Sequence, residues 1–194
     1  MADQDDGNAE QGHDDRAGEA EDPGGRIVIL LRHGKSDYPG GVADHDRPLA
    51  PRGRREAALA GDWLRAGSWD PTGDATIDLV RCSSATRAKE TLERTGIDAP
   101  TSFTDEIYEA TSDEIIAMLR RVHHRVRTLL VVGHGPGLPD TALALAGQGS
   151  DPDALDAVQR GFPTSAMAVI DVPDAWAELD PDTTALRAVH VPRE

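Results

Sequence analysis

"RIVILLRHGKS", residues 26–36, is an apolar run that ends in charged and titratable groups. Its first six residues are rich in β-branched side chains and show no polar alternation, which is typical of a strand that is covered on both faces. Arg32, His33 and Gly34 follow at the predicted end of that strand. A surface loop could hold these residues without any function, whereas a site that binds an anion would need them, so the rest of the chain has to decide between the two.

Further apolar runs of the same kind alternate with helical patterns along the chain. Strands are predicted over 76–82, 127–133 and 165–172, and helices over 54–67, 86–96 and 112–124. Strands that alternate with helices of this length indicate an α/β fold, a three-layer α/β/α sandwich in which crossover helices cover both faces of a mostly parallel sheet. The segment 175–192 has a turn signal at 180–183, and we predict a hairpin there that completes one edge of the sheet.

Charge and composition exclude several classes of protein. The chain of 194 residues has 20 Lys and Arg against 35 Asp and Glu, a net charge of −15 that argues against nucleic-acid and anionic membrane partners. Residues 1–25 hold nine acidic residues and one basic residue, and we predict a disordered acidic tail ahead of one domain over 26–194. The sequence has no signal-peptide pattern, no run long enough for a membrane span and a single cysteine, Cys82, so we expect a cytoplasmic protein.

Charged residues follow three of the predicted strands. In a parallel sheet the carboxyl ends of the strands open on one edge, where ligands bind. The sequence therefore predicts that residues far apart in the chain converge there. They are Arg32, His33, Arg87 and His134.

This set of residues fits a phosphate pocket. Each of the two arginines can donate two hydrogen bonds to phosphoryl oxygens. Arg87 falls in the first turn of a helix whose predicted cap is Ser83 or Ser84, so the free amides of that helix would also face the anion. The glycines beside the two histidines would let a ligand approach the backbone. An unprotonated imidazole could attack phosphorus, and we expect His33 to be that nucleophile and His134 to be protonated and to donate to the transferring group.

Several stretches resemble the histidine phosphatase superfamily. "LLRHGKS", "CSSATRAKETLE" and "VVGHGPGL" are similar to its RHG motif, its later arginine and its second histidine, and "HDRPLAPRGRREAALAGDWL" and "IYEA" resemble the SixA-type phosphohistidine phosphatases. The resemblance implies a phosphoglycerate mutase-like fold without a large lid insertion. It also implies a nucleophile, His33, and phosphoryl-binding roles for Arg32, His33, Arg87 and His134.

The proton donor stays open between Glu106, Glu109 and no donor at all. The family places a Glu after the third strand region, and Glu106 in "TDEIYEA" looks similar to it. The chain also reads "CSSA" at 82–85 where the family usually has "CSPA". A departing imidazole accepts a proton readily near neutral pH, since the pKa of imidazolium is about 6.5, so a phosphohistidine substrate tolerates a weak donor.

The resulting hypothesis is a metal-independent phosphatase that acts through phospho-His33, most simply on protein phosphohistidine. A small-molecule phosphomonoesterase of the same superfamily and a non-catalytic phosphoprotein-binding module are the alternatives. No cofactor is expected, and the adjacent residues Asp44, His45 and Asp46 are poorly spaced to face one metal ion. The expected partner is a phosphorylated protein or a small phosphoester.

Overall fold

The computed structural model describes residues 25–193. Its elements, in chain order, are β1 (Arg26–Arg32), the short 3-10 helix η1 (Asp44–Asp46), α1 (Pro51–Ala66), β2 (Leu79–Ser83), α2 (Thr86–Thr95), β3 (Thr101–Thr104), the short 3-10 helix η2 (Asp105–Ile107), α3 (Ser112–Leu119), β4 (Thr128–Gly133), α4 (Gly137–Ala144), α5 (Pro152–Arg160), β5 (Met167–Val172), the short 3-10 helix η3 (Trp176–Glu178) and β6 (Ala185–His190). The tail predicted over 1–25 lies, apart from Gly25, outside the described residues.

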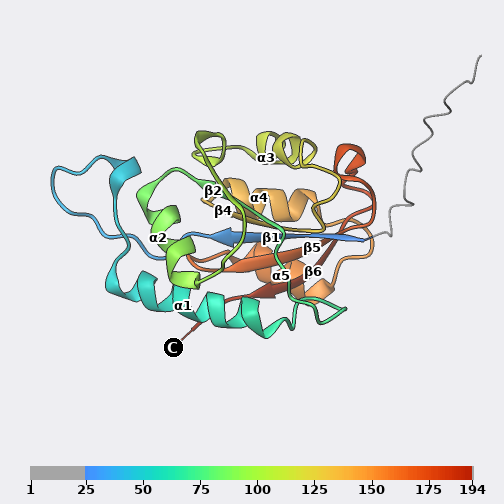
Figure 1. The fold of residues 1–194 in the computed structure, drawn as a ribbon, viewed down its shortest axis with the longest axis horizontal. Coiled ribbons are helices and arrows are strands. Elements are labelled where there is room, and N and C mark those ends of the chain that lie inside the picture. The colour runs from blue at the N-terminus through green and yellow to red at the C-terminus, as the bar shows by residue number, and fades with distance from the viewer. Residues whose placement is uncertain (1–24, 194) are drawn as a thin grey trace, which may run out of the picture.

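The strands form one sheet in the order β3-β2-β4-β1-β5-β6. β3, β2, β4 and β1 run parallel, whereas β5 pairs antiparallel with both β1 and β6. The predicted mostly parallel sheet is therefore confirmed. In Figure 1 the arrowhead of β1 points toward the protruding loop that leads to α1, so the carboxyl edge of the sheet lies on that side.

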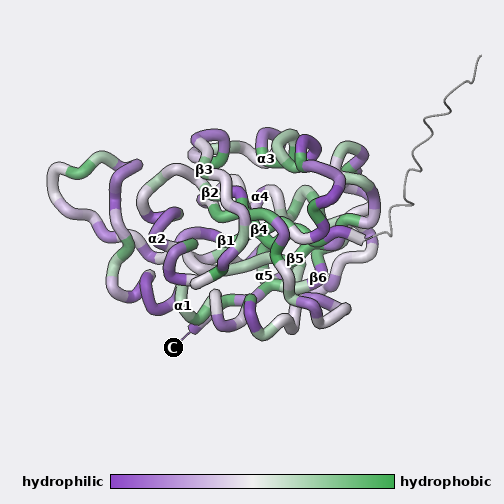
Figure 2. Tube along the Cα trace, viewed as in Figure 1, coloured by the Kyte–Doolittle hydropathy of each residue, from purple (hydrophilic) through white to green (hydrophobic). Residues whose placement is uncertain are grey.

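The central strands are apolar throughout because helices cover both faces of the sheet. Along β1, Val28 and Leu30 face the layer of α3, α4 and α5, whereas Ile29 and Leu31 face the layer of α1 and α2. All four side chains are fully buried. Figure 2 shows apolar segments concentrated in the central strands, with polar segments on the outlying helices and loops. No helix within residues 25–193 is long and apolar enough to cross a membrane.

Three details differ from the sequence prediction. The helix predicted over 112–124 ends at Leu119, because tight turns follow and the buried Val122 returns the chain to the core. The predicted hairpin has its second strand in β6, an edge strand that pairs with β5, but its first piece is η3 rather than a strand. There the indole Nε1 of Trp176 donates to Val126 O at 2.7 Å, which anchors a turn. The edge strand β3 was not predicted.

Candidate active site

β1 delivers His33 to the carboxyl edge of the sheet. Leu31 faces the layer of α1 and α2, and the two-residue period of a strand gives His33 the same direction. The main-chain N–H of His33 donates to Gly133 O on β4 at 2.9 Å, so the pairing of β1 with β4 continues past the strand end. The next N–H, of Gly34, donates to Thr91 Oγ1 on α2 at 2.9 Å. His33 is thus fixed between the sheet and α2.

The contacts of the His33 ring determine which nitrogen is free to react. Nδ1 lies 2.7 Å from Gly34 O, and because a carbonyl oxygen can only accept, Nδ1 carries the proton. Nε2 accepts from the Nε–H of Arg87 at 3.3 Å and therefore holds a lone pair. Burial first, and then the nearby charges of Arg87 and Arg32, lower the pKa of His33 to about 4, although the hydrogen bond to Gly34 O acts in the opposite direction. Near neutral pH, His33 is an unprotonated imidazole.

Arg87 is the second residue of α2, as predicted, but the predicted cap is wrong. The N-cap of α2 is Ala85, and no side chain caps the helix. The physical reason is that Ser83 and Ser84 turn toward the pocket instead: the hydroxyl of Ser83 lies 2.8 Å from His134 Nε2 and that of Ser84 lies 2.9 Å from His45 Nε2. The uncapped helix start adds its positive end to the guanidinium charge.

His134 follows β4 and lies beside His33. The two ring centroids are 4.9 Å apart. Burial first, and then the charges of His33 and Arg87, lower the pKa of His134 to about 3, so the ring is neutral near neutral pH when no anion is bound, unlike the protonated His134 that the sequence predicts. Nδ1 of His134 is a buried atom without a hydrogen-bond partner among the described residues. A bound anion would favour an N–H at that atom.

Arg32 reaches the same edge from the other face of the sheet. Its Nη1 donates to Phe162 O at 2.6 Å, and its guanidinium carbon would lie 3.1 Å from a Cβ at Gly135. Its Nε is buried and has no hydrogen-bond partner among the described residues. Its charge reaches His33, whose pKa it lowers. Arg32 also lines a cavity of about 630 Å³ together with Arg160 at the end of α5 and residues that follow α5 and β6.

Comparisons with known proteins identify the family. Residues 28–118 match the family model of the histidine phosphatase superfamily, branch 1. The solved structure of the candidate phosphohistidine phosphatase SixA from Nakamurella multipartitia is 38% identical, with a TM-score of 0.76 over 88% of this chain and 98% of that chain. The chain belongs to the histidine phosphatase superfamily.

Two further relatives refine this assignment. The candidate phosphohistidine phosphatase SixA from Agrobacterium tumefaciens is 27% identical, with a TM-score of 0.68 over 86% of this chain and 99% of that chain. An uncharacterized protein of Mycobacterium tuberculosis is 48% identical over 164 residues, which make up 84% of this chain and 100% of that protein. The predicted SixA-type histidine phosphatase fold is confirmed.

Neither proton-donor candidate of this histidine phosphatase makes a hydrogen bond to His33, Arg87 or His134 among residues 25–193. The carboxylate of Glu106 binds Arg121 Nη2 at 2.7 Å, and both side chains are exposed. Glu109 is exposed. The pKa of Tyr108 is raised by burial, by its hydrogen bond to Asp44 and by the charge of Glu109. The contacts of residues 25–193 therefore do not support Glu106 as the donor, because its carboxylate is held by Arg121 and not by a pocket residue.

The outer rim of the pocket contains groups that the sequence prediction missed. Asp44 contacts Arg87 through both its main-chain oxygen and its carboxylate. Tyr108 packs edge-on against His134, with ring centroids 5.3 Å apart, and against His45 at 5.0 Å. The acidic "DHD" turn was visible in the sequence, but only as a poor metal site. Among residues 25–193, no three His, Cys, Asp or Glu side chains are arranged to hold a metal ion.

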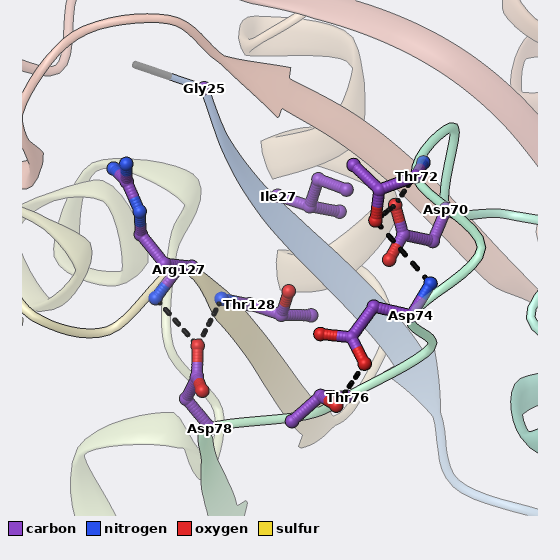
Figure 3. Close-up of a pocket in the computed structure, with 9 residues that line it drawn as sticks. All are labelled: Gly25, Ile27, Asp70, Thr72, Asp74, Thr76, Asp78, Arg127 and Thr128. Atoms are coloured by element: carbon purple, nitrogen blue, oxygen red, sulfur yellow. Dashed lines mark hydrogen bonds between the residues drawn. The ribbon is translucent and has the colours of Figure 1, made fainter. Parts of the chain in front are cut away.

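A second cavity opens at the opposite edge of the sheet (Figure 3). It has a volume of about 280 Å³ and contains the carboxylates of Asp70, Asp74 and Asp78. The carboxylate oxygens of these residues accept hydrogen bonds from the surrounding loops and strand starts. Oδ2 of Asp78 accepts from the main-chain N–H groups of Arg127 and Thr128 at 2.7 and 2.8 Å. The carboxylates of this cavity therefore stabilise the loop over 70–78 and the start of β4, and His33 lies at the other edge of the sheet.

Proposed function

We propose that this protein hydrolyses phosphoryl groups through a phosphohistidine intermediate on His33, and that its substrate is protein phosphohistidine. The observation that carries the proposal is the unprotonated Nε2 of His33, which accepts from Arg87 Nε at 3.3 Å, both side chains being buried. Membership of the histidine phosphatase superfamily supports phosphatase chemistry. The likeness to two candidate phosphohistidine phosphatases supports the substrate class.

The first step transfers the phosphoryl group to the protein. The lone pair of His33 Nε2 forms a bond to phosphorus, while the bond from phosphorus to the leaving nitrogen breaks and its electron pair stays on that nitrogen. Arg32 and Arg87 offset the charge on the phosphoryl oxygens, and the buried Nδ1 of His134 donates to one of them once the anion favours its protonation. Water then cleaves the new N–P bond and releases inorganic phosphate.

The arrangement of acids favours a substrate that needs no strong proton donor. An alcohol leaving group requires a proton from a well-placed acid, whereas imidazole leaves with a conjugate-acid pKa of about 6.5. Glu106 is engaged by Arg121, as described above. A phosphohistidine therefore suits this pocket better than the phosphoester of an alkyl alcohol.

The proposal extends to the metal requirement and to the compartment. Two guanidinium groups and the start of α2 supply positive charge to the phosphoryl group, so we propose that hydrolysis needs no divalent cation. Turnover measured after treatment with EDTA should equal untreated turnover, and restoration by Mg²⁺ or Zn²⁺ would contradict this. The buried free thiol of Cys82, whose pKa burial raises to about 12, fits our proposal of a reducing cytoplasm.

The experiment that tests the function compares two substrates. The protein is incubated with a histidine-containing protein that has been phosphorylated chemically by phosphoramidate, and in parallel with p-nitrophenyl phosphate. We expect phosphate release from both, with the larger kcat/KM for the phosphoprotein. Release from p-nitrophenyl phosphate alone would favour the small-molecule phosphomonoesterase, and binding without release from either would favour the phosphoprotein-binding module.

The intermediate can be trapped directly. Rapid quenching in alkali should leave labelled phosphate on the wild-type protein that is stable to alkali and lost in acid. His33→Ala should carry no such label and lose turnover by at least about 10³-fold. His123→Ala, an exposed histidine away from the pocket, is the matched control and should behave as wild type.

A further inference from the structure

Asp44 lies at the outer end of the Arg87 guanidinium. Nε of Arg87 donates to His33, while Nη1 donates to Asp44 O at 2.6 Å and Nη2 donates to Asp44 Oδ2 at 3.0 Å. The guanidinium therefore spans from the nucleophile to this carboxylate. A phosphoryl group attacked by His33 must expel its leaving group on the side away from His33, because attack and departure are in line. Asp44 binds the end of the guanidinium that points away from His33.

The Asp44 carboxylate is held in its charged form while part of it stays open to solvent. Arg47 Nη1 donates to Oδ1 at 2.6 Å, and the Tyr108 hydroxyl donates to Oδ2 at 2.8 Å. These two hydrogen bonds, followed by the charge of Arg87, lower the pKa of Asp44 to about 2. The side chain nevertheless remains 53% exposed. Asp44 is therefore an acceptor on the solvent-exposed side of Arg87 and cannot donate a proton near neutral pH.

An ionised carboxylate at this place distinguishes leaving groups by charge. A phosphoester or an aryl phosphate brings no positive charge on the leaving side, so Asp44 offers it nothing and adds repulsion. A phosphohistidine ring that is protonated on its second nitrogen is a cation with an N–H donor. A charged acceptor stabilises that cation and fixes the direction of the N–H.

We propose that Asp44 determines specificity by accepting a hydrogen bond from the free ring N–H of a substrate phosphohistidine held as its imidazolium form. This inference rests on the proposed function. When His33 Nε2 bonds to phosphorus, the electron pair of the breaking P–N bond stays on the leaving ring nitrogen, and the ring becomes neutral imidazole that keeps its other N–H. No proton has to reach the leaving nitrogen in that step, so the pocket works without a general acid.

The test is the ratio of two kcat/KM values, phosphohistidine protein over p-nitrophenyl phosphate, in wild type and in Asp44→Asn. We expect the ratio to fall about 10- to 100-fold in the variant, the size of one lost hydrogen bond to a charged group. Asp46→Asn is the matched control: it lies in the same turn, is 67% exposed, and its carboxylate contacts His45. Its ratio should equal that of wild type. Asp44→Ser repeats the comparison if the amide variant does not fold.

Each other outcome overturns the inference in a distinguishable way. If both kcat/KM values fall together in Asp44→Asn, the carboxylate acts only by orienting Arg87. If neither value changes, it has no role, and if Asp46→Asn shifts the ratio equally, the effect is one of general charge. If the wild-type protein does not release phosphate from phosphohistidine, the proposed function itself fails and this inference with it.

Discussion

The two pocket histidines are buried as neutral rings, and this links folding to pH. The folded pKa values of His33 and His134 are lowered to about 4 and about 3, below the ordinary value of about 6.5 that applies in the unfolded chain. Between these values the unfolded chain binds protons that the folded protein does not bind. The unfolding free energy that the neutral rings contribute is therefore greatest above about pH 6.5, and it falls as the pH is lowered toward 4.

We predict that His134→Asn removes part of this pH dependence. Between pH 7 and pH 4.5 the wild type should lose about 2 to 3 kcal/mol more unfolding free energy than the variant, because the variant has no such ring to protonate on unfolding. Denaturant titrations at the two pH values measure the difference. His123→Asn, at an exposed position, should lose as much as wild type. Equal slopes in wild type and His134→Asn would contradict a buried neutral His134.

Glu106 offers a second test at the residue scale. Because its carboxylate is held by Arg121 on the exposed surface, we predict that Glu106→Gln changes kcat/KM for phosphohistidine protein by less than about threefold. The loss of this exposed ion pair should cost at most about 1 kcal/mol of unfolding free energy. Arg121→Gln removes the same pair from the other side and should match it. A loss of activity near 100-fold in Glu106→Gln alone would identify Glu106 as the proton donor after all.

The central residues of the site could be predicted because strand ends fix them. His33 and His134 directly follow neighbouring parallel strands, so topology alone brings them together. The contacts of Ser84 and Asp44 could not be predicted, because they depend on how turns orient side chains, and turns have no periodicity that reveals direction. The family resemblance named the phosphoryl-binding residues, but it did not indicate that Asp44 occupies the outer donors of Arg87.

At the scale of elements, the loop after β1 packs directly on the start of α1. A Cβ at Gly34 would lie 2.8 Å from Gly53 O, and a Cβ at Gly53 would overlap the main-chain oxygen of Lys35. Both glycines are therefore required by the close approach of two backbones. The sequence interpretation that glycine beside His33 admits a ligand is incomplete, since the protein itself fills that space.

We predict that Gly53→Ala displaces the loop that carries His33. The added methyl group has main chain as its neighbour, which cannot move aside as a flexible side chain could, so the variant should lose about 1 to 3 kcal/mol of unfolding free energy. Because the loop moves, kcat should fall as well, by about tenfold or more. Gly40→Ala is the control, since nothing lies within 4 Å of a Cβ there. Unchanged stability and kcat in Gly53→Ala would show that the two backbones are not in contact.

The elements themselves were predictable to different degrees. α2 begins and ends at residues 86 and 95 with the left-handed Gly96 as its cap, as the pattern of periodicity and glycine predicts. β3 was missed because it is short, lies at the edge of the sheet and has partly exposed, largely polar side chains. The antiparallel direction of β5 is not encoded in its apolar run, because a buried strand has the same pattern in either direction.

At the scale of the whole molecule, an acidic chain must attract an anionic substrate to a cationic pocket. The net charge is −15, and residues 1–24 contribute nine acidic residues and one basic residue to it. The described domain packs its own core on both faces of the sheet, and β1 begins only at Arg26, whose Nη1 donates to Asp174 O at 2.8 Å. We therefore expect folding and chemistry to depend on groups within 25–193, and the approach of substrate to depend on the charge of the whole chain.

We predict that a variant starting at Gly25 keeps its unfolding midpoint and its kcat but loses part of its electrostatic repulsion of substrate. At low ionic strength, kcat/KM for p-nitrophenyl phosphate should rise by up to a few-fold, and the difference from the full chain should vanish near 0.5 M salt, where the Debye length falls to about 4 Å. Steady-state rates across a salt series measure this. A loss of kcat that persists at high salt would mean instead that the first 24 residues contribute a contact to catalysis, because screening removes long-range repulsion but not a direct contact.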